Sequence, residues 1–181
     1  MQISEPAEYV LLGLLKTRSM HGYELFQQVQ NSTLGQIVHI EMSQMYALLK
    51  KLERLHYIEA QLEPQGLRPP RKIFHLTENG HSVFLDWLAQ PVQKPRDIRI
   101  LFLIKLYFLQ RSSPAQMAQL ITEQIHACER FLEHLEAQHH DIGPLADAAF
   151  FEQVVLSSRI HQTRSLLEWL HDLQATSFVH S

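Results

Sequence analysis

The chain has 181 residues and a formal net charge of −3, with 45% hydrophobic and 19% charged residues. This composition is that of a globular protein and excludes a disordered or fibrous chain. The slightly acidic balance excludes a surface that is basic throughout, so any nucleic-acid-binding surface must be local. The lone cysteine, Cys128, excludes an intrachain disulfide and predicts a cytoplasmic location.

Membrane segments are not expected in this sequence. The strongest apolar run, residues 101–109, is interrupted by Lys105 and is too short to span a bilayer. The N-terminal residues 1–6 lack the basic region of a secretory signal peptide. We therefore expect no membrane partner.

The first half of the chain begins with three predicted helices, at residues 5–16, 21–30 and 43–56. The third has the clearest pattern, because its apolar residues recur at helical spacing and its other side is polar. We expect Ser43 to cap this helix. The residues expected to face the core are Met45, Leu48, Leu49, Leu52 and Leu55.

After the third helix the apolar period changes from that of a helix to two. This change predicts strands at 57–63 and 71–76, joined by the turn residues 64–70. Together they form a hairpin with a basic loop. Thr77 is expected to cap a further helix at 78–89.

The Pro-bracketed segment 90–96 marks a domain boundary. Helices follow at 97–111, from 114 onward, and after the break at Gly143–Pro144. The last two repeat apolar residues in steps of four and three, the spacing of a coiled-coil seam. We expect residues 96–181 to form a helical dimerisation domain, with these seam residues: Ile121, Ile125, Cys128, Leu132, Leu135, Leu156, Ile160, Thr163, Leu167 and Leu170.

Three helices followed by a basic hairpin is the order of a winged helix-turn-helix, here residues 1–90. In that fold the third helix enters the major groove of DNA. Residues 43–72 carry six Lys and Arg against three Glu, whereas residues 126–181 carry three Arg against eight acidic residues. The predicted fold class is therefore mainly α, with an N-terminal winged helix and a C-terminal coiled-coil-like dimerisation domain.

Eight residues are the candidates for contact with double-stranded DNA. On the third helix, Tyr46 and Lys50 are the foremost candidates for reading base edges, and Lys51 for a phosphate contact. The alternative for the helix is a solvated polar face, and for the hairpin ordinary surface charge. The full set is Ser43, Gln44, Tyr46, Lys50, Lys51, Arg68, Arg71 and Lys72.

Several segments resemble the PadR family of transcriptional regulators, over roughly the first 110 residues. They are residues 9–15 (YVLLGLL), 20–25 (MHGYEL), 43–53 (SQMYALLKKLE), the wing segment 65–80 and the segment 99–109. The resemblance implies a homodimeric regulator, commonly a repressor, that binds an inverted repeat. It also implies that some members respond to small aromatic or drug-like molecules.

An effector, if the protein has one, is expected at the domain junction or the dimer interface. Trp87 and Tyr107 are the aromatic residues that could stack there on a flat ligand. The alternative is that both rings simply pack in a core.

Enzymatic and metal-binding functions are not expected. The sequence has no glycine-rich phosphate loop and no Gly-x-Ser-x-Gly motif, and His126 and Cys128 point to different helix faces. No cofactor is expected. The rival to a DNA-binding regulator is a winged helix that binds only protein, which would have no need for the three bases of the wing.

Overall fold

The structure is a computed structural model that describes residues 3, 5–66, 68–141 and 147–177. The chain divides into two compact units. The first comprises Met1–Gln90 together with Arg99–Phe108, and the second comprises Pro91–Ile98 together with Leu109–Ser181. The expected boundary at 90–96 thus differs from this division in one respect, because residues 99–108 group with the first unit.

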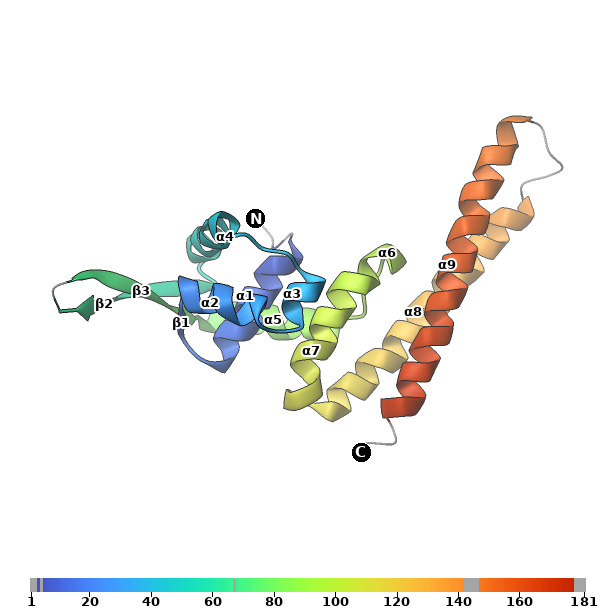
Figure 1. Ribbon diagram of the computed structural model, residues 1–181. Helices are drawn as coiled ribbons and strands as arrows, with labels where there is room; N and C mark the ends of the chain where they lie inside the picture. The colour runs from blue at the N-terminus through green and yellow to red at the C-terminus, as the bar shows by residue number, and fades with distance from the viewer. Residues whose placement is uncertain (1–2, 4, 67, 142–146, 178–181) are drawn as a thin grey trace. The chain divides into compact units, whose positions relative to one another are not determined.

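The first unit has the winged-helix order expected from the sequence, and the fold class is confirmed (Figure 1). Its helices are mainly those predicted, to within one or two residues at each end. Its elements are α1 (Pro6–Thr17), β1 (Met20–His21), α2 (Gly22–Gln30), α3 (Leu34–Ile37), α4 (Met42–Arg54), β2 (Ile58–Gln65), β3 (Arg68–Leu76) and α5 (Glu78–Ala89).

The core of this unit is built from the apolar faces of its helices. The expected inward residues of α4 are buried, apart from Leu55, which is half-buried and is the C-cap of the helix. Thr77 caps α5 as predicted, with its hydroxyl accepting a hydrogen bond from the Gly80 N–H at 3.0 Å. Helix α4 begins earlier than expected, because its N-cap is Glu41 and not Ser43.

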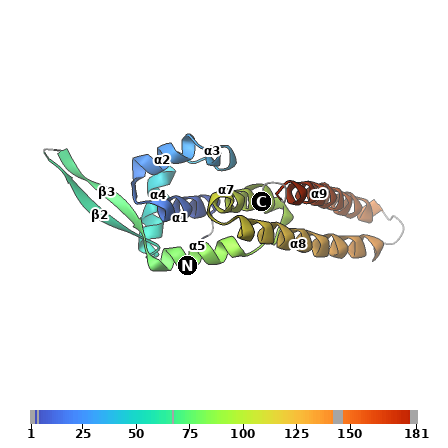
Figure 2. The ribbon, with the colours of Figure 1, turned by 90° about the horizontal axis from the view of Figure 1, so that it is seen from below.

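The sheet has three antiparallel strands in the order β1-β3-β2. Strands β2 and β3 form a hairpin, the wing, which projects away from the helices (Figure 2). The wing is longer than predicted, because residues expected in the turn belong to strands. Pro69 and Pro70 lie in β3 beside a register shift between Glu63 and Gln65, where a residue without an N–H is tolerated.

The segment after the linker starts with a helical turn, α6 (Pro95–Asp97), and a π-helical turn, η1 (Ile98–Phe102), before α7 (Leu103–Ser112). The Phe108 ring packs edge-to-face on Phe84 of α5, with ring centroids 5.4 Å apart. It also covers Gly13 so closely that no side chain fits there. These contacts explain why residues 99–108 belong with the winged helix.

The second unit contains two long helices, α8 (Pro114–Asp141) and α9 (Asp147–Ser177), which pack along each other. Gly143 and Pro144, the expected break, lie outside the described residues. Arg164 of α9 pairs with Glu136 of α8 at 2.6 Å. The Gln124 side chain bonds both the N–H and the carbonyl of Val92, at 2.7 and 2.9 Å, and so ties the linker to α8.

Within this single chain most residues of the predicted seam are already buried. The seam residues are buried between α8 and α9, apart from Leu132 and Leu156, which are half-buried. Within the described part of the chain, no helix is long and apolar enough to cross a membrane.

Candidate nucleic-acid interface

Helix α4 presents a polar face to solvent because its buried residues, Met45, Leu48, Leu49 and Leu52, lie on the opposite side. Ser43, Gln44, Tyr46 and Lys50 are exposed, and the Tyr46 side chain keeps 51% of its surface accessible. A side chain of that size so exposed is available to a partner.

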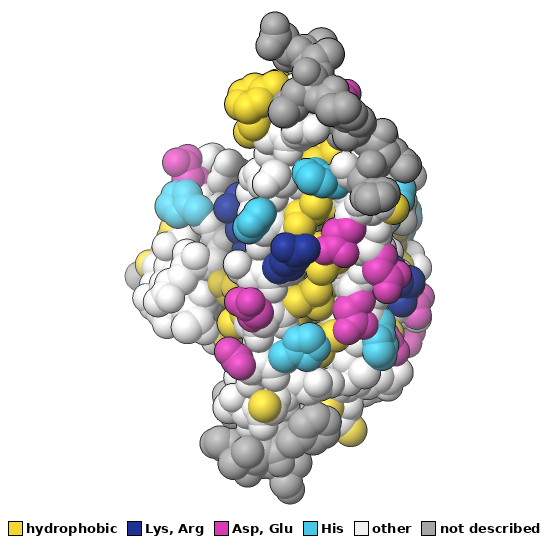
Figure 3. Space-filling view, turned by 90° about the vertical axis from the view of Figure 1, so that its right-hand side faces the viewer, with side chains coloured by type: hydrophobic (Ala, Val, Ile, Leu, Met, Phe, Trp, Pro, Cys, Tyr) yellow, Lys and Arg dark blue, Asp and Glu magenta, His cyan; other side chains and the backbone are white. Residues whose placement is uncertain are grey.

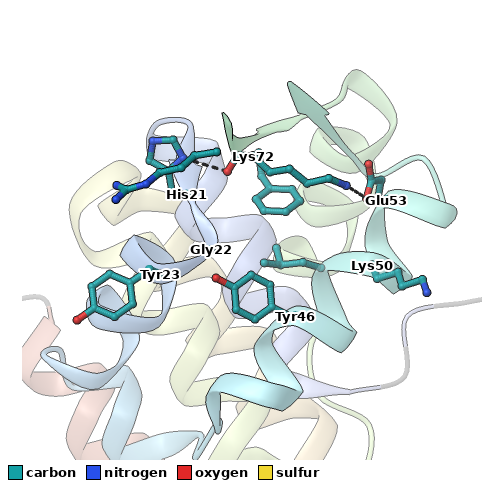
Figure 4. A pocket seen from close by; sticks show the side chains of 10 residues that line it. His21, Gly22, Tyr23, Tyr46, Lys50, Glu53 and Lys72 are labelled. Atoms are coloured by element: carbon teal, nitrogen blue, oxygen red, sulfur yellow. Dashed lines mark hydrogen bonds and ion pairs between the residues drawn. The ribbon is translucent and has the colours of Figure 1, made fainter. Parts of the chain in front are cut away.

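A groove of about 610 Å³ lies between this face, the start of α2 and strand β3 (Figure 4). Its floor is apolar and aromatic, and its rim is mainly cationic. Such a surface suits a polyanion that also offers apolar sugar and base edges. The lining residues are His21, Gly22, Tyr23, Tyr46, Leu49, Lys50, Glu53, Arg71, Lys72 and Phe74.

The glycine at the start of α2 positions the Tyr46 ring. A Cβ atom at Gly22 would lie 2.8 Å from Cε1 of Tyr46, closer than packing allows, and a tight 3.3 Å from Cδ1 of Leu49. The ring therefore rests against the backbone of α2. This contact holds one of the two foremost base-reading candidates in a defined orientation.

The wing supplies the second set of expected bases. Arg71 and Lys72 are exposed on β3 and line the groove, and Arg68 begins the same strand. The Lys72 ammonium lies 3.4 Å from a carboxylate oxygen of Glu53 on α4. The structure therefore brings wing and helix bases together around one groove.

Lys51 lies apart from this groove. Its ammonium is 2.7 Å from a carboxylate oxygen of Glu8, whose side chain is fully buried in α1. The other oxygen of that carboxylate accepts a hydrogen bond from the Glu5 N–H at 2.9 Å. This ion pair joins α1 to α4. Removal of Lys51 would leave the buried Glu8 charge without this cation, which destabilises the fold.

Six of the residues that line the groove were not predicted as site residues, and His21 and Glu53 are among them. His21 lies beside a glycine at the start of a predicted helix, which is the signal that could have drawn attention to it. Its ring nitrogens face the wing, with Nδ1 3.0 Å from the Lys72 carbonyl oxygen and Nε2 3.2 Å from a Glu63 carboxylate oxygen.

The effector candidates Trp87 and Tyr107 lie elsewhere in the first unit. The Trp87 ring stacks on Tyr9, with ring centroids 3.9 Å apart and an interplanar angle of 9°. Tyr107 packs edge-to-face against Phe108, at 5.2 Å. Both rings are half-buried and already have aromatic neighbours.

Lys105 lies next to Trp87 and is almost completely buried, with 2% of its surface exposed. Its ammonium donates hydrogen bonds to the carbonyl oxygens of Trp87 and Gln90 at the end of α5, and lies 4.0 Å from the Trp87 ring centroid. Burial lowers the pKa of Lys105 to about 7. Cations at the C-terminal end of a helix are favourable, which accounts for this placement.

No cluster of three or more His, Cys, Asp or Glu suited to a metal ion occurs among the residues that the structure describes. Cys128 is buried and makes a 3.7 Å contact with Gln124. Burial raises the pKa of the Cys128 thiol, which disfavours the reactive thiolate.

The fold and this site define the class of protein. It is a winged-helix protein with a cationic groove between the third main helix and the wing. Residues 11–85 match the model described as Transcriptional regulator PadR-like family, and residues 98–176 match Virulence activator alpha C-term. Residues 11–85 thus form a domain of the PadR-like family of transcriptional regulators, and the chain is similar to a regulator of this family along most of its length.

The chain is also similar to a curated relative and to two solved structures. The chain is 25% identical over 174 residues to the negative transcriptional regulator PadR of Bacillus subtilis, covering 93% of this chain and 95% of the relative. It is 25% identical to the structure of B. subtilis PadR in complex with operator DNA, covering 97% and 99% of the two chains, with a TM-score of 0.49. For B. subtilis PadR in complex with p-coumaric acid the identity is 24%, the coverage 95% of each chain and the TM-score 0.43.

Proposed function

We propose that this protein is a sequence-specific DNA-binding transcriptional repressor. The observation that carries the proposal is the groove in which the exposed face of α4 and the bases of the wing meet. The match of residues 11–85 to a family of transcriptional regulators, which are not enzymes, supports it. We infer repression because the curated relative is named a negative transcriptional regulator.

In this proposal α4 lies in the major groove and the wing lies along the neighbouring backbone. Ser43, Gln44, Tyr46 and Lys50 read base edges, since their side chains are exposed on one face. The wing bases Arg68, Arg71 and Lys72 contact phosphates and supply most of the affinity. Lys51 is left out of the contact set, because its ammonium pairs with buried Glu8.

The active form in this proposal is a homodimer that binds a palindromic site. Helix α9 supports it, because several large apolar side chains remain exposed after α8 and α9 have packed together. Hydrophobic side chains run in a band among acidic and histidine side chains on the face that Figure 3 shows. The exposed apolar residues of α9 are Phe150, Phe151, Val154, Val155 and Trp169. A two-fold dimer presents two α4 helices to half-sites one helical turn, or a multiple of it, apart.

Selection of binding sites from a random duplex pool tests the proposal, followed by mobility shifts at low and high salt. We expect a palindromic consensus, and an affinity that falls steeply with salt because phosphate contacts release counterions. No enrichment and no shift at either salt would favour the rival, a winged helix that binds only protein. The three wing bases argue against that rival.

We also propose that an aromatic small molecule releases the protein from DNA by binding at Trp87 and Tyr107. The buried ammonium of Lys105 beside Trp87 favours this place, since it would attract an anionic group on a flat ligand. Because Trp87 stacks on Tyr9, such a ligand has to displace Tyr9. Titration of p-coumaric acid, followed by Trp fluorescence and DNA release, tests this. Release at full strength from a Trp87→Ala, Tyr107→Ala double variant would exclude the site.

A repressor acts where the chromosome is, and we place this protein in the cytoplasm. The single buried cysteine is compatible with a reducing compartment. Fractionation of cells that express the tagged chain would check the location.

A further inference from the structure

The imidazole of His21 joins the start of α2 to both strands of the wing. Nδ1 lies 3.0 Å from the carbonyl oxygen of Lys72 in β3, the contact drawn in Figure 4. Nε2 lies 3.2 Å from a carboxylate oxygen of Glu63 in β2. Each ring nitrogen thus faces a hydrogen-bond acceptor.

Two acceptors cannot both be satisfied by a neutral imidazole, which carries a single N–H. The imidazolium carries two and can donate to the Lys72 carbonyl and to Glu63 together. Taking up a proton therefore adds one hydrogen bond between α2 and the wing, and it turns the Glu63 contact into an ion pair. Histidine is the side chain that makes this exchange near neutral pH.

Glu63 is the carboxylate in direct contact with the ring, and Glu24 also interacts electrostatically with it. On α2, the Glu24 carboxylate accepts a hydrogen bond from the His21 backbone N–H at 3.0 Å and pairs with Arg18 at 3.2 Å. On β3, the Lys72 ammonium is engaged by Glu53 of α4. The remaining cations that line the same groove are Lys50 of α4 and Arg71 of β3, both exposed and hence screened by solvent.

The same place is where the wing meets the rest of the fold. Strand β1 pairs with β3 only through Met20 with Phe74 and His21 with Ile73. Because β1 is so short, the orientation of the wing depends on side-chain contacts at the base of the hairpin. The His21 ring is such a contact, and it lies on the wall of the groove next to the wing bases.

We propose that His21 is a positioning residue that fastens the wing in a proton-dependent manner. The protein then holds DNA more tightly on the acidic side of neutrality than on the alkaline side. This inference rests on the proposed DNA-binding function for its consequence, but the fastening itself is a property of the free protein.

The first test uses the full-length protein without DNA. Nitrogen-15 NMR of the His21 ring is followed from about pH 6 to about pH 8, together with amide exchange of β2 and β3. We expect both ring nitrogens to be protonated at the lower pH and the wing amides to be better protected there. Wing protection that stays the same while the ring titrates would overturn the proposal.

The second test measures DNA affinity at the same two pH values and constant salt, on a site selected from the random pool. The variants are His21→Asn, since Asn caps helices well but cannot carry the charge, and His126→Asn as a control. His126 is also a histidine beside a carboxylate, 3.0 Å from Glu129, but it lies in the second unit. We expect the ratio of the affinities at the lower and higher pH to fall about fivefold in His21→Asn and to stay unchanged in the control.

A wild-type ratio retained by His21→Asn would overturn the link to DNA. If the wild type binds no DNA at either pH, the proposed function fails. In that case the NMR measurement still decides on its own whether the wing is fastened by His21.

Discussion

At the scale of single residues, Lys105 makes stability depend on pH. Burial lowers its pKa to about 7 in the folded chain, whereas an exposed lysine titrates near 10.5. Between these values the unfolded chain binds more protons, so the free energy of unfolding rises as the pH increases from 7 toward 10. Urea denaturation at pH 7 and pH 9 should show this rise in the wild type. Lys105→Met should lack it, and an equal rise in that variant would refute the assignment.

Tyr46 and Arg71 represent the two kinds of contact in the proposed interface, and their substitutions should differ. Tyr46→Ala should weaken specific binding by about 1–3 kcal/mol and leave binding to random DNA nearly unchanged. Arg71→Ala should weaken both and lower the salt slope by about one. Mobility shifts on selected and random duplexes distinguish these outcomes, with Tyr46→Phe as the control that keeps the ring. Unchanged specific binding by Tyr46→Ala would mean that α4 is not the reader.

At the scale of elements, the close approach of α5 to the end of α4 can be tested at Gly80. A Cβ atom there would collide with the backbone carbonyl of Tyr57, which cannot move aside as a side chain could. Gly80→Ala should therefore destabilise the fold by about 1–3 kcal/mol in thermal or urea unfolding. Gly66 at the wing turn has a φ of 61° and open space around it, so Gly66→Asn should cost less than Gly80→Ala, because Asn tolerates the left-handed conformation and meets no neighbour. Equal stabilities of the two variants would contradict this packing.

The elements that the sequence predicted well are those whose pattern is local. Helix α4 has apolar residues at helical spacing, and Thr77 is a good N-cap residue followed by a helix, so both could be placed without tertiary information. The face of α4 that carries Tyr46 and Lys50 followed from the same periodicity. That is why the candidate site on α4 could be outlined from the sequence.

The elements that were missed depend on contacts distant in sequence. Strand β1 exists only because Met20 and His21 pair with β3, more than fifty residues away. Pro69 and Pro70 indicate a turn locally, yet the hairpin continues through them beside a register shift. Lys51 forms an ion pair with Glu8 of α1, and counting charges along the sequence cannot predict this pair.

At the scale of the whole molecule, the winged helix should need residues beyond its apparent boundary. A fragment that ends at residue 90 loses Phe108, which covers Gly13 and packs on Phe84. It also loses Lys105 of α7, whose ammonium donates hydrogen bonds to carbonyl oxygens at the end of α5. We expect such a fragment to bind the dye ANS and to lack near-UV circular dichroism, and one that ends at residue 112 to fold. A well-folded shorter fragment would show that these contacts are dispensable.

The proposed dimer can be tested on the exposed side of α9. Phe151 is 72% exposed and Val155, one turn later, lies on the same side. Charges at both positions, Phe151→Glu with Val155→Glu, should shift sedimentation from dimer to monomer. Gln116→Glu, at an exposed polar position of α8, should leave the dimer intact. A dimer that survives the double substitution would place the interface elsewhere.

The contact between Gly22 and Tyr46 has a consequence for how binding preference can change by mutation. A methyl group at Gly22 would push the Tyr46 ring out of its place, so Gly22→Ala should behave as a loss of specificity although residue 22 reads no base. A smaller residue at position 46 would make room for that methyl group. Because Tyr46→Ala already removes the ring that reads the base, adding Gly22→Ala to it should cost little further specificity, and the effects of the two substitutions should be far from additive.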